Sequence, residues 1–133
     1  MRYNAILTDK SILNELLQQP VLGSRMMKEV AFFHKETNTM ILVDLIENIG
    51  DNTEGTNIPL RIWWFIFRMW NKAKPAPEYQ LGWSNKKEAA TSLQIMLNWD
   101  FDKIILSHGD LITTNAKDTA KGAWQNILKH INK

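Results

Sequence analysis

Hydrophobic and polar positions along the chain predict a series of short helices and strands. Residues 9–18 repeat apolar side chains at helical spacing and predict a helix that ends before Pro20. Residues 29–35 and 40–46 have the composition of strands and are separated by a short turn, which predicts a hairpin. The second run is apolar and rich in Ile, Leu and Val, as expected for a strand that is buried on both faces.

The rest of the chain predicts helices around one more strand. Residues 60–70 are apolar on nearly every side of a helix that Pro59 can begin, and Asn85 can cap the next helix. Three further predictions complete the chain: a loop over residues 75–83, a short buried strand within 101–109, and a last helix capped by Asn115. This order indicates a layered α/β fold, and the length fits a single domain over residues 1–133.

Composition narrows the class of protein. Apolar residues make up 44% of the chain and charged residues 23%, and the net charge of +2 comes with scattered lysines, which argues against a nucleic-acid binder. The chain has no cysteine, so disulfides and thiolate metal sites are excluded. No leader-like run occurs, and no stretch reaches the roughly 18 apolar residues of a membrane span. We therefore expect a cytoplasmic protein that does not contact membranes.

Two polar side chains that follow apolar runs are the candidates for chemistry. Asp44 ends the run ILVD, and His108 follows the run IILS. Ligands of α/β folds bind at the carboxyl ends of strands, where an imidazole can bind a metal or act as a general base. Two interpretations stay open for each residue: Asp44 caps the loop backbone or receives a cation, and His108 bonds a backbone carbonyl or binds a metal.

The order of several motifs resembles a known family. VAFFHKETNTMILVDLIEN, a tryptophan-rich helix and WDFDKIILSHGDLI together resemble the second half of an uncharacterised family with a metallo-β-lactamase-like fold. QPVLGSRMMKEV fits the segment before the hairpin, so the match covers roughly residues 18–112. The resemblance implies half of an αββα sandwich, with a short mixed sheet, a hairpin and about four helices.

The resemblance also implies a metal site. In the wider superfamily, an aspartate at a strand end bridges two metal ions and a histidine on a late strand binds one of them. The matching positions are Asp44 and His108, with zinc or another divalent metal as the cofactor. The superfamily's main histidine cluster, His-x-His-x-Asp-His, does not occur in this chain. A catalytic zinc needs about three protein ligands, and Glu47 is the third candidate.

The apolar helix over residues 62–70, IWWFIFRMW, is relevant to binding partners. A half domain with only two layers would leave one face of its sheet, or this helix, exposed to solvent, and large exposed apolar patches mark contact with a partner. Three interpretations stay open: a helix buried in the core, self-association as a homodimer, or a membrane-surface helix with Arg61 and Arg68 at the headgroups. The helix lacks a broad polar face, so the membrane interpretation ranks last. We expect a non-catalytic relative that forms homo-oligomers through this helix. The alternative is a metal-dependent hydrolase that uses Asp44 and His108 with ligands from a second chain.

Overall fold

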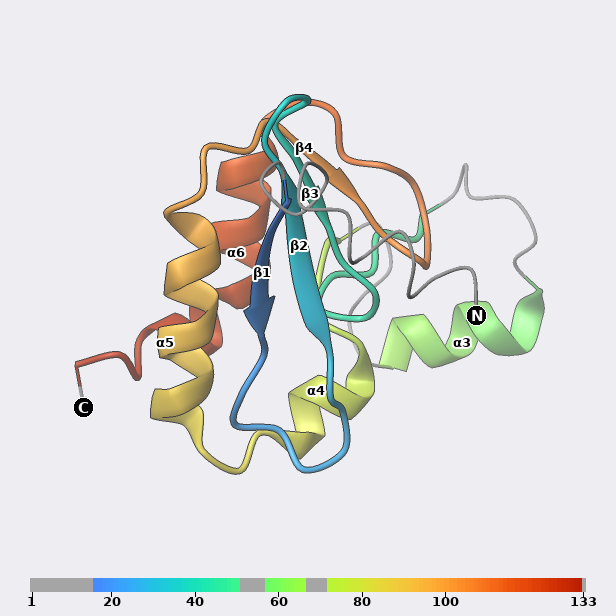
Figure 1. Cartoon of the computed structure of the whole chain (residues 1–133). Helices are drawn as coiled ribbons and strands as arrows, with labels where there is room; N and C mark the ends of the chain where they lie inside the picture. Colours follow the sequence, from blue (N-terminus) through green and yellow to red (C-terminus); the bar gives the residue numbers. More distant parts are fainter. Residues whose placement is uncertain (1–15, 51–56, 67–71, 133) are drawn as a thin grey trace, which may run out of the picture.

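The computed structural model describes residues 16–50, 57–66 and 72–132. In chain order its elements are β1 (Leu16–Pro20), β2 (Val30–His34), β3 (Thr39–Ile41), α3 (Ile58–Ile66), α4 (Pro77–Gly82), α5 (Lys86–Leu97), β4 (Lys103–Ile105) and α6 (Ala116–Leu128). Within these residues the strands form one sheet in the order β1-β2-β3-β4, with antiparallel pairs up to β3 and a parallel β3–β4 pair (Figure 1). The α/β class, the mixed sheet and the hairpin are confirmed.

Helices α5 and α6 pack against each other and cover one face of the sheet (Figure 1). Met40 and Ile104 are paired across β3 and β4, and both side chains are buried on this face. The largest fully buried side chains of the two helices are Leu93, Met96 and Trp124. The hydrophobic core therefore lies between the sheet and this helix pair.

The opposite sheet face is partly open. Phe32, Ile41 and Ile105 form one row across β2, β3 and β4, and Ile105 is 44% exposed. Within the residues that the structure describes, no second sheet covers this row. An α/β layer with one covered face is compatible with half of a sandwich.

Capping signals placed two helices well. The Asn85 side chain accepts a hydrogen bond from the Glu88 N–H at 3.1 Å, and α5 begins at the next residue. Asn115 precedes α6 as expected, but it has a left-handed φ of 49° and its side chain makes no capping hydrogen bond. The sequence therefore predicted that α6 begins after Asn115, but not the left-handed backbone conformation of Asn115.

Two predicted segments were wrong. Leu16 and Leu17, expected at the end of a helix over residues 9–18, lie in β1, because their backbone pairs with β2 opposite His34 and Phe33. Residues 9–15 lie outside the described part of the chain. The expected loop over 75–83 contains the short helix α4, which begins with a proline at its first turn.

The predicted strand over residues 40–46 is much shorter than expected. Only Thr39–Ile41 forms β3, although Leu42, Leu45 and Ile46 are all buried. The apolar run is thus a short strand followed by a buried loop, and composition cannot distinguish the two. This loop carries Asp44.

Helix α3 exposes the apolar side chains that the sequence singled out. Ile58 is 74% exposed and Ile66 is 65% exposed, and Ile62 and Trp63 are about half exposed. Figure 1 places α3 apart from α5 and α6. Within the predicted run 62–70, the side chains of Ile62, Trp63 and Ile66 are therefore not buried in a core, while residues 67–70 lie outside the described part. None of the described helices is long and apolar enough to cross a bilayer.

Candidate metal centre

The parallel pairing of β3 and β4 brings the two candidate side chains to the same edge of the sheet. Ile41 pairs with Ile105, and both strands end there. Asp44 lies as far beyond Ile41 as His108 lies beyond Ile105. Because parallel strands have their carboxyl ends at one edge, the two segments leave the sheet together.

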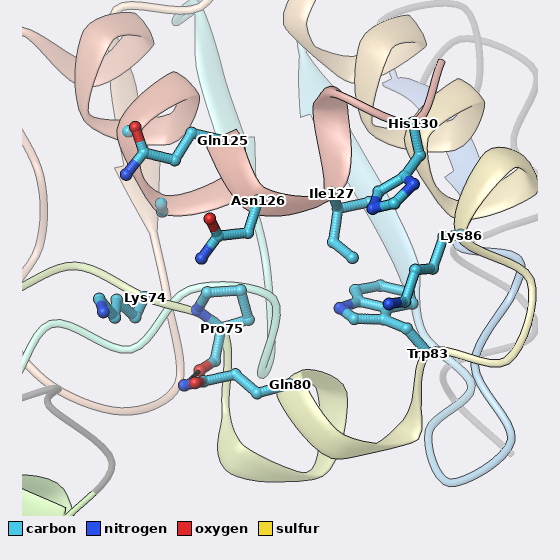
Figure 2. Close-up of a pocket in the computed structure, with 11 residues that line it drawn as sticks. Lys74, Pro75, Gln80, Trp83, Lys86, Gln125, Asn126, Ile127 and His130 are labelled. Atoms are coloured by element: carbon cyan, nitrogen blue, oxygen red, sulfur yellow. Dashed lines mark hydrogen bonds between the residues drawn. The ribbon is translucent and has the colours of Figure 1, made fainter. Parts of the chain in front are cut away.

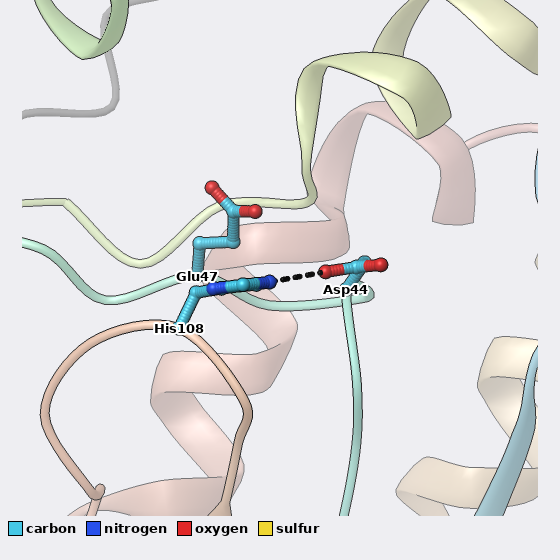
Figure 3. Close-up of side chains that lie close together, drawn as sticks. All are labelled: Asp44, Glu47 and His108. Carbon is cyan, nitrogen blue, oxygen red and sulfur yellow. Dashed lines mark ion pairs between the residues drawn. The ribbon is translucent and has the colours of Figure 1, made fainter. Parts of the chain in front are cut away.

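Asp44 and His108 face each other across this edge. The Nε2 atom of His108 lies 3.3 Å from Oδ1 of Asp44 (Figure 3). The Asp44 side chain is 18% exposed and that of His108 is 54% exposed. The two groups thus meet where the protein opens to solvent, with the carboxylate on the inner side.

Glu47 completes the cluster. One ligand atom from each of Asp44, Glu47 and His108 lies within 4.8 Å of the others. Glu47 is buried in the loop after β3, and Figure 3 shows its carboxylate above the imidazole ring, with Asp44 at the ring edge. The third candidate of the sequence is therefore at the same place as the first two.

Backbone hydrogen bonds fix His108 next to the loop after β3. The Asn48 N–H donates to the His108 carbonyl at 3.1 Å, and the Asp110 N–H donates to the Asn48 carbonyl at 2.8 Å. Gly109 lies between His108 and Asp110 in the chain and has a φ of 103°. A Cβ at this position would lie 2.1 Å from the carbonyl oxygen of Asn48. Only glycine can occupy this position without displacing the backbone.

The loop after β3 is fixed from two further directions. The Glu47 N–H donates to the Lys74 carbonyl at 2.7 Å, and the Ala76 N–H donates to the Asp44 carbonyl at 2.8 Å. From α6, Nε1 of the buried Trp124 donates to the Leu45 carbonyl at 3.0 Å. Asp44 and Glu47 therefore extend from a backbone whose polar groups are paired with distant segments, as a buried loop requires.

A buried carboxylate that the sequence analysis missed positions Asp44. Glu29 accepts hydrogen bonds from the Val43 N–H at 2.7 Å, the Asp44 N–H at 3.0 Å and the Tyr79 hydroxyl at 3.2 Å. Burial is the main cause of a raised pKa for the Glu29 carboxyl, and burial together with the Glu29 charge also raises the pKa of Tyr79. Glu29 precedes β2 and lies in the QPVLGSRMMKEV segment, but no chemistry was assigned to it, so the sequence alone did not single it out as a functional residue.

The donor set fits a divalent cation. One imidazole nitrogen and two carboxylates are ligands that zinc and related metals accept. The two carboxylates lie close together, and a cation would relieve the repulsion between their charges. By contrast, His34 bonds the Thr37 hydroxyl at 2.8 Å in the turn after β2 and does not belong to the cluster.

Comparisons with known proteins do not identify a relative. No family model matches the chain, and no curated protein matches it.

Proposed function

We propose that this chain is a metallo-β-lactamase-like half domain that binds a divalent cation through Asp44, Glu47 and His108. The observation that carries the proposal is the convergence of these three side chains within 4.8 Å at the carboxyl ends of two parallel strands. The sequence resemblance to metallo-β-lactamase-like proteins points to two of the same residues.

The alternative in which Asp44 only caps the loop backbone has little support. The side chain of Glu29 caps the loop backbone instead, because its carboxylate accepts hydrogen bonds from the N–H groups of Val43 and Asp44. The Asp44 carboxylate instead faces His108. A carboxylate and an imidazole held this way suit a metal ion, and Glu47 adds the third donor.

Compared with the superfamily that the sequence resembles, the site lacks the main histidine cluster that takes part in hydrolysis. A bound zinc ion would supply Lewis-acid chemistry and lower the pKa of a coordinated water toward neutrality. This chain would contribute one imidazole and two carboxylates, and its sequence has no His-x-His-x-Asp-His cluster to add further imidazole ligands. We therefore propose that the isolated chain binds metal without catalysing hydrolysis.

The test is a zinc titration by calorimetry after treatment with EDTA. The wild-type chain is expected to bind about one zinc ion per chain, since three ligands make one site. Asp44→Asn and His108→Ala should each abolish or strongly weaken this binding. His34→Ala and Asp100→Asn change the same residue types outside the cluster and should bind like the wild type. Equal binding by all five proteins, or no binding by the wild type, would contradict the proposal.

Self-association is a second proposed property. It is supported by the apolar side chains that α3 exposes, because large exposed apolar patches mark contact with a partner. A second copy could also bring ligands to the metal cluster, which is the hydrolase alternative. That alternative predicts hydrolysis only with metal present and only at concentrations at which the chains associate.

A further inference from the structure

The segment that pairs with Glu47 also lines a cavity. Lys74 and Pro75 of this segment, together with α4, the start of α5 and the end of α6, enclose a cavity of about 210 Å³. Trp83, Lys86 and His130 gather at one end of this cavity, and Lys74 lies at the other (Figure 2). None of these side chains belongs to the metal cluster.

The charge of the cavity wall is one-sided. Lys74, Lys86 and His130 line it, and no Asp or Glu does within the described part of the chain. Gln80 and Asn126 add side-chain amides, which donate hydrogen bonds as well as accept them. A wall of two lysine ammonium groups, an imidazole and amide donors, without carboxylates, favours an anion.

The inner surface of the cavity is aromatic and apolar. Trp83 is half-buried, and its ring packs on Tyr79 with ring centroids 4.9 Å apart. Ile127 points toward the same ring in Figure 2, and Lys86 lines the cavity together with it. A ring held in this way presents a flat face on which a planar ligand can stack.

The helix α6 leaves its side of the cavity open at Gly122. This glycine lies within the helix, where glycine is less favourable than alanine. A Cβ added there would have no heavy atom within 4 Å, so no close packing demands glycine. The open wall leaves room for a ligand.

We propose that this cavity binds a small organic anion with one aromatic ring. The ring stacks on Trp83, and the phosphate or carboxylate group lies between Lys86 and His130. The volume of about 210 Å³ is below that of pockets for drug-sized ligands, so it suits a single ring and not a dinucleotide. The amides of Gln80 and Asn126 can bond polar atoms at the ring edge.

The experiment compares three probes by ¹H–¹⁵N NMR titration of the full chain in EDTA, which keeps the result independent of the metal cluster. The probes are phenyl phosphate, inorganic phosphate and phenol. Phenyl phosphate is expected to bind about tenfold more tightly than either of the others, because it alone uses both the ring and the cations. It should shift the indole N–H signal of Trp83, assigned with Trp83→Phe.

Matched lysine variants separate the cavity from general surface charge. Lys86→Gln and His130→Gln should each weaken phenyl phosphate binding about fivefold or more, whereas Lys87→Gln should not. Lys87 is exposed on the same turn of α5 but does not line the cavity. The proposal is overturned if Lys87→Gln weakens binding as much as Lys86→Gln, if inorganic phosphate binds as tightly as phenyl phosphate, or if no probe shifts the Trp83 signal.

Discussion

The imidazole Nε2 of His108 lies 3.3 Å from the carboxylate Oδ1 of Asp44, although the two residues belong to distant parts of the sequence. Their contact follows from the register of two parallel strands, in which Ile41 is opposite Ile105. A shift of this register by one residue would turn the side chains of one strand to the other face. The candidate metal centre therefore depends directly on how β3 and β4 are paired.

Metal binding should stabilise the fold. A ligand that binds only the folded state at 100 times its Kd raises the free energy of unfolding by about 2.7 kcal/mol. We expect zinc to raise the urea midpoint of the wild-type chain and EDTA to reverse the change. Asp44→Asn should show neither effect, and a zinc response of the same size in that variant would contradict the assignment.

Replacing Gly109 by alanine should destabilise the protein. Its φ of 103° is unfavourable for any residue with a Cβ, and the new methyl group would meet the Asn48 carbonyl. We expect a loss of about 1–3 kcal/mol in urea unfolding, together with weaker zinc binding through the displaced His108. Gly122→Ala is the matched control, because it has open space in a helix and should instead stabilise the protein by about 1 kcal/mol.

Glu29→Gln should lower stability and change its pH dependence. The glutamine side chain has one acceptor oxygen, whereas the two oxygens of the Glu29 carboxylate accept from the Val43 and Asp44 N–H groups. One of these N–H groups therefore loses its partner, which we expect to lower the free energy of unfolding by about 1–3 kcal/mol.

The sign of the pH effect follows from the raised pKa of Glu29 in the folded protein. The carboxyl group of Glu29 binds its proton more tightly in the folded protein than in the unfolded chain. Protonation of Glu29 therefore adds to the free energy of unfolding. This contribution is fully present below the ordinary pKa of 4.5 and is lost as the pH rises through the raised pKa. The stability difference between wild type and Glu29→Gln, measured in EDTA, should therefore be larger at pH 4.5 than at pH 7. An equal difference at both values would rule out this role for the Glu29 proton.

Trp124→Phe should weaken the support of the loop after β3. The substitution removes the hydrogen bond to the Leu45 carbonyl and leaves space in the core. We expect a loss of about 1–3 kcal/mol in the free energy of unfolding. A loss below a few tenths of a kcal/mol would show that the loop is held without this bond.

Ile62→Glu tests association through α3. If the exposed apolar side chains of this helix contact a second copy, the wild type should elute as a dimer in size exclusion with light scattering, and the variant as a monomer. Ile95→Glu is the control, since it places the same charge at an exposed isoleucine of α5. A wild-type monomer at micromolar concentration would count against self-association.

Local signals were sufficient for several elements. Asn85 and Glu88 located the start of α5, and the turn between β2 and β3 was predictable because the polar ETNT stretch separates two apolar runs. Asp44 and His108 were singled out as side chains that follow apolar strands. Such predictions succeed because caps, turns and apolar periodicity depend on neighbours in the sequence.

Tertiary structure decided the rest. Leu16 and Leu17 lie in a strand because β2 offers their backbone a partner, and residues 42–46 form a loop because Glu29, Ala76 and Trp124 bond its polar groups. The sequence by itself determined which residues carry candidate chemistry and that they end apolar runs. Only the parallel register of β3 and β4 decided that Asp44 and His108 meet and that Glu47 joins them, because pairing between distant strands leaves no local mark in the sequence.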